Sequence, residues 1–403
     1  MRILYHHRIR SDDGQAVHVR ELIRALRQEG HQVLECALVP KATDSEPGAD
    51  QPSPQSKGEA PESGGGGLWS KLSLPRVATE CLEIAYGGQG ARRILKAAES
   101  FQPDLIYERH SLHLDSALRA GRKLSIPVFV EVNSPLVDEM KTLSLLKFEG
   151  RARRTEKRVL SSVDRVFAVT EVLRQELISL GSVPERTVVT PNGVDLARYG
   201  VALESAAAEF RQAAGVLDGD FVLGFVGYMR DWHRLDLAIR LLTRPGFESA
   251  RIVLVGDGPA LPGLHDLAAE QGVSDRVHAV GTRTAEELPA VVKAFDAALI
   301  PAINRYASPL KLFDSLAAGV ATLAPDQPNL RETIDDGLDG VLFEPGDRES
   351  LEKALLPLVR DRALADRIGA AGRQRLERED WTWRGNAKRV VTEFERLQSE
   401  VNR

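Results

Sequence analysis

The residues best suited to chemistry in this sequence form a short run in its second half. Ser308 and Pro309 precede an apolar helical pattern, and serine is a favoured N-cap while proline is a favoured first helical residue. A helix starting here leaves the amides of Leu310 and Lys311 free at the positive end of its dipole. This pattern predicts an anion site, with an ordinary helix start as the alternative. Asp314 shares a helix face with Lys311, and a Lys–Asp surface pair is the alternative for these two.

Further polar and cationic side chains follow an apolar run at residues 221–226. They are Arg230, His233 and Arg234, and arginine suits bidentate contacts with phosphate oxygens. A solvated surface charge is the alternative for each arginine. If the run is a strand, these side chains lie beyond its carboxyl end.

Candidate binding residues in the first half also follow apolar runs. Gly14 lies in the first turn, where a glycine lets backbone approach a ligand closely. His18, four residues later, is as readily a histidine on a helix surface. Asn133 can hydrogen-bond a hydroxyl group but cannot act as a base. Glu108 and Arg109 end another run on the same side of the predicted sheet.

Metal and dinucleotide sites are weakly supported. The acidic pairs Asp12-Asp13 and Asp335-Asp336 could be mistaken for a cation site, but neighbouring carboxylates in a strand or loop tend to point apart. Cysteine and histidine show no ligand spacing. Gly256-Asp257-Gly258 lacks the third glycine of a dinucleotide fingerprint. We expect no metal.

The elements that position these residues alternate between short apolar runs and longer helical patterns, which predicts an α/β fold with parallel sheets. Two such halves form a cleft, and ligands bind at the carboxyl ends of parallel strands. Strands are predicted at residues 3–5, 33–39, 105–107, 128–132, 166–169 and 188–190, and then at residues 221–226, 252–255, 277–280, 297–300 and 321–324.

Several loops at these strand ends, taken together, resemble one family. The sequence is similar to the retaining GT-B glycosyltransferases of group 1, glycosyltransferase family 4. The resemblance implies two facing Rossmann-like domains: an acceptor-side domain at 1–195, a donor domain at 196–380, and a terminal helix at 381–403 that crosses back. Its motifs are Pro191-Asn192-Gly193-Val194-Asp195, Phe225-Val226-Gly227, Val255-Gly256-Asp257-Gly258-Pro259, Val280-Gly281-Thr282, Ser308 to Gly319 and Trp381-Thr382-Trp383.

The resemblance implies a hexosyltransferase-like enzyme that uses a UDP- or GDP-linked sugar, with no cofactor and no metal. Cationic side chains and a helix N-terminus would stabilise the leaving diphosphate, whose oxygen takes the acceptor proton. The acceptor would be a glycan, a lipid-linked molecule or a small molecule. The residues implied are Lys311, Arg230 and Asn133 for catalysis; Gly227, His233, Arg234, Gly281, Thr282, Ser308, Pro309, Leu310 and Asp314 for the donor; and Gly14, Glu108 and Arg109 for the acceptor.

Three departures from the family pattern keep a non-catalytic function open. Tyr306 stands where the family usually has a glutamate, Asp314 replaces a second glutamate that would bind ribose, and His233 stands where a lysine is usual. The cationic role would then pass to Arg230, Arg234 or Lys311. The alternatives are a sugar-nucleotide epimerase with the same fold and a non-catalytic protein that binds nucleotide sugars.

Composition bounds the partners and the compartment. The net charge of −5 gives no broad basic surface for nucleic acid. Cys36 and Cys81 are too few for a disulfide framework, and the polar start lacks an apolar leader, so we expect a cytoplasmic protein. Residues 41–67, rich in Pro, Gly and Ser, predict a flexible loop. The basic run 151–158 predicts a solvated helix face, or peripheral contact with the inner membrane surface.

Overall fold

The computed structural model describes residues 1–11, 13–41, 76–200 and 203–401. The predicted loop at 41–67 therefore lies outside the described residues except for Lys41, as does Asp12 of the first acidic pair. The chain divides into two compact units. The first comprises Met1–Pro191 and Trp383–Arg403, and the second comprises Asn192–Thr382.

The first unit is built on a parallel sheet that is six-stranded within the described residues. Its side chains alternate between two buried faces: Tyr5 and Tyr107 share one face, while His6 and Glu108 share the other. In spatial order the strands are β2 (Gln32–Ala37), β1 (Arg2–His7), β3 (Leu105–Arg109), β4 (Val128–Val132), β5 (Arg165–Ala168) and β6 (Thr187–Val189).

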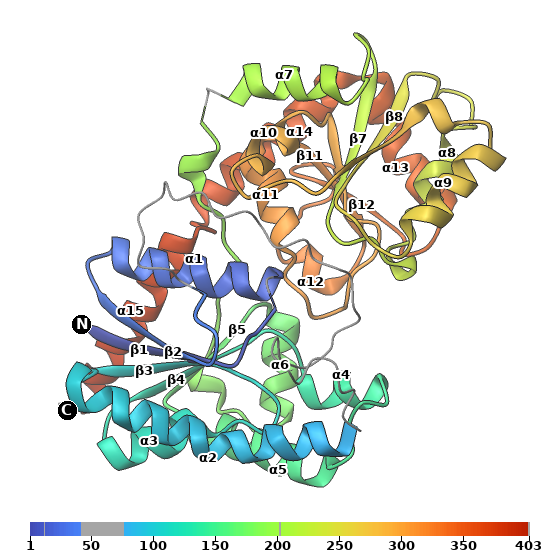
Figure 1. The fold of residues 1–403 in the computed structure, drawn as a ribbon. Coiled ribbons are helices and arrows are strands. Elements are labelled where there is room, and N and C mark those ends of the chain that lie inside the picture. The colour runs from blue at the N-terminus through green and yellow to red at the C-terminus, as the bar shows by residue number, and fades with distance from the viewer. Residues whose placement is uncertain (12, 42–75, 201–202, 402–403) are drawn as a thin grey trace. The chain divides into compact units, whose positions relative to one another are not determined.

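Helices cover both faces of this sheet (Figure 1). The chain's last described helix packs beside the first one, where Arg384 pairs with Glu29 at 2.7 Å and Asn386 donates to the Pro191 carbonyl at 2.7 Å. The helices are α1 (Gly14–Gln28), α2 (Arg76–Phe101), α3 (Ser116–Leu124), α4 (Leu136–Thr142), α5 (Glu149–Ser162), α6 (Glu171–Ser179) and α15 (Trp383–Val401).

The second unit repeats this plan. Side chains of its strand β7 (Phe221–Val226) point alternately to the two faces of the sheet. Phe221, Leu223 and Phe225 therefore join the apolar cluster on one face, and Val222 joins the cluster on the other. The strands, in spatial order, are β12 (Val341–Phe343), β11 (Ala321–Pro325), β10 (Ala297–Leu299), β7 (Phe221–Val226), β8 (Ala250–Val255) and β9 (Val277–Gly281).

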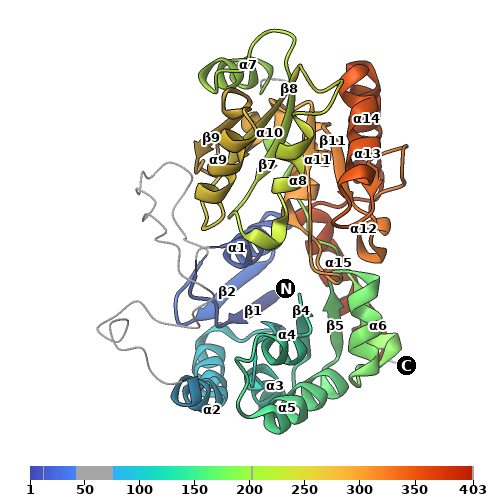
Figure 2. The ribbon, with the colours of Figure 1, turned by 90° about the vertical axis from the view of Figure 1, so that its right-hand side faces the viewer.

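The helices of the second unit lie on both sides of its sheet, as the view in Figure 2 also shows. They are α7 (Leu203–Ala213), α8 (Asp236–Leu241), α9 (Leu261–Glu270), α10 (Leu288–Lys293), α11 (Leu310–Ala318), α12 (Pro328–Arg331), α13 (Arg348–Arg360) and α14 (Arg362–Arg378). The parallel pairing in both sheets confirms the predicted α/β class. Strand β12 was not predicted, because its three apolar residues are too few for a period to show.

Candidate active site

The predicted anion site is the start of helix α11, and the structure changes one detail of it. The helix begins at Leu310, its N-cap residue is Pro309, and none of the described side chains caps it. The expectation that Ser308 is the N-cap is therefore wrong. The hydroxyl of Ser308 accepts instead from the backbone N–H of Asn192 at 3.1 Å. The uncapped amides of the first turn still carry the positive end of the helix dipole.

Lys311, in the first turn of α11, places its ammonium group against strand β7. Its Nζ lies 4.1 Å from the centre of the Phe225 ring, and a Cβ built on Gly227 would be 3.0 Å from it. Burial lowers the pKa of Lys311 to about 8. In the part of the chain that the structure describes, this ammonium forms no ion pair. A partly desolvated cation beside an uncapped helix start is suited to a multivalent anion.

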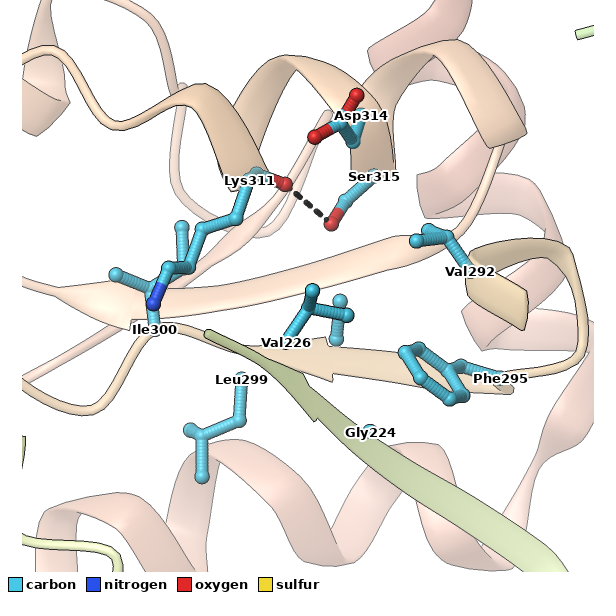
Figure 3. Close-up of a pocket in the computed structure, with 10 residues that line it drawn as sticks. Gly224, Val226, Val292, Phe295, Leu299, Ile300, Lys311, Asp314 and Ser315 are labelled. Atoms are coloured by element: carbon cyan, nitrogen blue, oxygen red, sulfur yellow. Dashed lines mark hydrogen bonds between the residues drawn. The ribbon is translucent and has the colours of Figure 1, made fainter. Parts of the chain in front are cut away.

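Asp314 lies one turn later on α11, and its carboxylate is held by a tyrosine. The hydroxyl of Tyr199 donates to Asp314 Oδ1 at 2.7 Å. Burial and the nearby charge of Asp314 raise the pKa of Tyr199 well above its ordinary value. In Figure 3 the carboxylate of Asp314 and the ammonium of Lys311 point in different directions from the helix.

A small pocket lies under this helix face, between α11 and strands β7 and β10 (Figure 3). Its polar side is formed by Lys311, Asp314 and Ser315, and the hydroxyl of Ser315 donates to the Lys311 carbonyl at 2.8 Å. The other residues that line it are Gly224, Val226, Val292, Phe295, Ala298, Leu299 and Ile300. The ammonium therefore has an apolar wall on one side, which is the physical cause of its lowered pKa.

The turns after β7 and β8 interlock through glycines. Gly227 has φ +144°, and its N–H bonds the Val255 carbonyl at 2.9 Å. A Cβ on Gly256 would lie 2.1 Å from the Gly227 carbonyl oxygen, and one on Gly258 would lie 2.2 Å from that of Met229. Only glycine fits these contacts, so the sequence motif around residues 255–259 encodes a close backbone packing at the sheet's carboxyl edge.

The predicted cations after β7 have different surroundings. Burial, with the charges of Lys311 and Arg230, lowers the pKa of His233 to about 3, and its Nδ1 accepts from the Arg230 N–H at 3.1 Å. His233 is therefore neutral and cannot supply the charge of the lysine that the family usually carries there. Arg234 pairs with Asp236 at 3.0 Å and is about half exposed. Arg230 lies over the ring of Tyr228 at 5.0 Å, and its charge acts on His233 together with that of Lys311.

Gly281 and Thr282, also predicted for the donor, end strand β9 and are exposed. The Gly281 carbonyl accepts from the Gly256 N–H at 2.8 Å, which joins this turn to the glycine-rich turn after β8. Thus the start of α11 and the turns that follow β7, β8 and β9 all lie at the carboxyl edge of the second sheet. Arg234 is directed toward Asp236.

In the first unit, Arg109 is part of a buried network centred on a glutamate that the sequence motifs did not single out. Arg109 donates to Glu131 Oε1 at 2.8 Å, and His18 Nε2 lies 3.0 Å from Oε2. The hydroxyls of Tyr5 and Tyr107 each donate to this carboxylate at 3.0 Å. Although burial alone would raise the pKa of Glu131, the charges and hydrogen bonds of His18 and Arg109 hold it well below its usual range.

His18 is thus buried and not on a helix surface, and its ring packs edge-on against Trp383 at 5.0 Å. Glu108 lies on the opposite face of the sheet. Its Oε2 takes a 2.6 Å bond with His6 Nδ1 and a 3.0 Å bond from the Ala117 N–H, while its Oε1 has no partner among the described residues. The side chains of Glu108 and Arg109 therefore lie on opposite faces of the sheet, at the carboxyl end of β3.

Asn133 and Gly14 complete the predicted acceptor side. Asn133 follows β4, and its Oδ1 is buried without a partner among the described residues. Gly14 is the first residue of α1 and is exposed. It follows the N-cap residue Asp13, whose side chain accepts from the Gln15 N–H at 2.9 Å. His110 follows β3 directly, and burial and the charge of Arg8 lower its pKa to about 4. His110 was missed, although its place directly after β3 was a usable signal.

Within the described ranges, no group of three or more His, Cys, Asp or Glu side chains is arranged to hold a metal ion. In the same ranges, no helix is both long enough and apolar enough to cross a membrane.

Comparison with known proteins agrees with the geometry. The family model described as Glycosyltransferase Family 4 matches residues 13–198, and the one described as Glycosyl transferases group 1 matches residues 207–375. Among curated relatives, D-inositol 3-phosphate glycosyltransferase of Nocardia farcinica is 30% identical over 58% of this chain, which spans only 56% of that relative's length. The protein of the same name from Thermobispora bispora is 30% identical over 67% of each chain.

Solved structures share the fold. A crystal structure of Anabaena Alr3699/HepE in complex with UDP has a TM-score of 0.70 at 17% identity and covers 99% of this chain and 100% of its own. The crystal structure of WaaG, a glycosyltransferase involved in lipopolysaccharide biosynthesis, has a TM-score of 0.66 at 15% identity. The match covers 97% of this chain and 100% of the WaaG chain. Two family matches that together span most of the chain, and a relative aligned over two thirds of its length, show that the chain belongs to the group 1 glycosyltransferases of the GT-B fold.

Proposed function

We propose that this protein transfers a sugar from a nucleoside-diphosphate donor to an acceptor hydroxyl, with retention of anomeric configuration and without a metal. The observation that carries the proposal is the partly desolvated ammonium of Lys311 beside the start of α11; this ammonium forms no ion pair with any residue that the structure describes. A diphosphate leaving group needs this combination of a fixed cation and oriented amides. The UDP complexes of a structural neighbour with the same fold support this choice of donor.

The proposed reaction needs no protein nucleophile. The bond between the anomeric carbon and the β-phosphate oxygen breaks, and a bond forms between that carbon and the acceptor oxygen on the same face. The acceptor proton passes to the departing phosphate oxygen. Lys311, Arg230 and the amides of Leu310 and Lys311 stabilise the charge that develops on the diphosphate, and Asp314 binds the ribose hydroxyls.

The acceptor is proposed to bind at the carboxyl edge of the first sheet. Gly14 permits close approach, Asn133 offers an amide oxygen that has no partner among the residues the structure describes, and Arg109 is held by Glu131. Relatives are named for an inositol phosphate acceptor and for a glucosyl-diacylglycerol product, so a polyol and a lipid are the two classes to test first.

The test is an assay of the purified full chain with panels of UDP- and GDP-linked sugars and these acceptors, in EDTA. One donor should raise the unfolding temperature, release its nucleoside diphosphate only with acceptor, and give a product whose anomeric configuration, read by NMR, matches the donor. Conversion of the donor sugar without acceptor would support the epimerase instead. Binding without turnover across the acceptor panel would support a non-catalytic protein, and loss of activity in EDTA would contradict metal independence.

We also propose a cytoplasmic location with peripheral membrane contact. The surface proposed to contact the membrane lies beside α5. Leu143 and Phe148 are 51% and 38% exposed in the loop before this helix, and Arg151 and Arg154 on α5 are exposed next to them. Apolar side chains among exposed cations are suited to an anionic lipid surface.

Cosedimentation with vesicles tests this contact. The chain should pellet with vesicles that contain phosphatidylglycerol and less with phosphatidylcholine alone, and Phe148→Ser should weaken the pelleting. Leu338→Ser is the matched control, because Leu338 is 62% exposed in the second unit. Equal binding to both vesicle types, or equal loss in both variants, would contradict the proposed surface.

A further inference from the structure

The segment that enters the second unit, residues 192–199, contacts helix α11 at Asp314 and the turn that leads into this helix at Ser308. At the start of the helix, the Asn192 side-chain amide donates to the Ser308 carbonyl at 2.5 Å, and its backbone N–H donates to the Ser308 hydroxyl at 3.1 Å. Asn192 is 8% exposed. Two hydrogen bonds from one buried residue fix the turn that leads directly into the first turn of α11, which carries Lys311 and the free backbone amides.

One turn further along, Tyr199 holds Asp314. Its hydroxyl is 2.7 Å from Asp314 Oδ1, and its side chain is buried. The backbone of Tyr199 is anchored as well, because Arg373 donates both to the Tyr199 carbonyl at 3.0 Å and to the Ala317 carbonyl in the last turn of α11 at 2.8 Å. The hydroxyl therefore acts on the aspartate from a fixed position.

Aspartate has a shorter side chain than glutamate, and a free aspartate in this position would sample several rotamers. A bond from a buried, neutral phenol to one oxygen fixes the direction of the other. We propose that Asn192 and Tyr199 are positioning residues of the donor site. Asn192 aims the α11 start and Lys311 at the diphosphate, and Tyr199 aims Asp314 at the ribose. The inference rests on the proposed function.

Because the two residues have different roles, their variants should lose affinity differently for two probes, UDP and inorganic pyrophosphate. Tyr199→Phe removes one hydroxyl and keeps the buried ring, so UDP should bind about five- to tenfold more weakly while inorganic pyrophosphate, which has no ribose, should bind as before. Asn192→Ala should weaken both probes by a similar factor. A merely structural role for Tyr199 would lower the unfolding temperature without separating the two probes. A merely structural role for Asn192 would lower the unfolding temperature and leave the affinity for both probes unchanged.

The experiment is calorimetric titration of the full chain and its variants with UDP, GDP and pyrophosphate, beside thermal unfolding of each protein. Tyr86→Phe is the matched control, since it removes a buried tyrosine hydroxyl in the first unit that lies 3.3 Å from His6. Adding Tyr199→Phe to Asp314→Asn should cause no further loss, because the hydroxyl acts through that carboxylate. Tyr199→Gln adds a control that keeps polarity without the phenol and should not restore affinity.

The outcomes separate the two proposals. Unchanged UDP affinity in Tyr199→Phe, equal losses for UDP and pyrophosphate in that variant, or an additive loss in the double variant would each overturn the inference alone. A wild-type chain that binds none of UDP, GDP and pyrophosphate would contradict the proposed function and overturn the inference with it.

Discussion

The ammonium of Lys311 lies 4.1 Å from the centre of the Phe225 ring. The face of an aromatic ring attracts a cation but neutralises none of its charge, and burial lowers the pKa of this lysine to about 8. The charge is therefore kept in place without a carboxylate partner among the described residues. An anion that binds there meets a cation that needs no rearrangement, as electrostatic stabilisation of a leaving group requires.

This pKa predicts how donor affinity depends on pH. Bound diphosphate favours protonated Lys311, so its pKa is higher in the complex than in the free protein, and UDP affinity should fall as pH rises through about 8. The slope should approach a tenfold loss per pH unit for one proton. Calorimetry from pH 7 to 9.5 measures it. Lys311→Arg is the control, because arginine stays protonated and its profile should be flat. A wild-type profile that is equally flat would exclude Lys311 titration from donor binding.

The interlocked turns predict opposite effects for two glycines. Gly258→Ala places a Cβ 2.2 Å from the Met229 carbonyl oxygen at φ +150°, so it should lower the free energy of unfolding by at least roughly 1–3 kcal/mol. Gly263→Ala, in helix α9 with open space around it, should raise that free energy by about 0.5–1 kcal/mol. Denaturant unfolding of both variants checks this. A tolerated Gly258→Ala would mean that the turns after β7 and β8 pack less closely.

The buried network of the first unit predicts a large effect on stability. Glu131→Ala leaves Arg109 buried without its carboxylate and should lower the free energy of unfolding by about 3–5 kcal/mol. Glu204→Ala is the control: it removes an exposed partner of Lys293 and should cost less than about 1 kcal/mol. Similar losses in the two variants would contradict the assigned role.

Acid unfolding provides an independent check on Glu131. Its folded pKa lies below the ordinary value of 4.5, so its stabilisation is fully present above that value and is lost as pH falls toward the folded pKa. Glu131→Gln should therefore show a shallower loss of stability below pH 4.5 than the wild type. Unchanged pH dependence in the variant would mean that another carboxylate dominates acid unfolding.

Much of the fold could be predicted from the sequence because buried parallel strands read as continuous apolar runs. Residues 128–132 and 221–226 coincide with β4 and β7. Strand β12 could not be found this way, since its three residues carry no period. The cap of α11 was misplaced by one residue because Ser308 bonds Asn192, which is 116 positions away, and local preferences cannot show that.

The site was predicted in part. Motifs at strand ends pointed to Lys311, Asp314 and the glycine turns because ligand-binding loops occupy those places in α/β folds. They did not show that His233 is neutral, since its pKa depends on burial beside Lys311 and Arg230. Glu131 was missed because a carboxylate inside a strand has meaning only when distant donors surround it.

The most direct test of the account is calorimetric titration of UDP and GDP into the wild-type chain and Lys311→Ala. We expect one nucleotide to bind the wild type in EDTA and to bind Lys311→Ala about 10- to 150-fold more weakly, the loss for a hydrogen bond to a charged group. Lys311→Arg should recover part of the affinity, and thermal unfolding should show both variants folded. Equal affinity in the wild type and Lys311→Ala, or no binding of either nucleotide to the wild type, would contradict it.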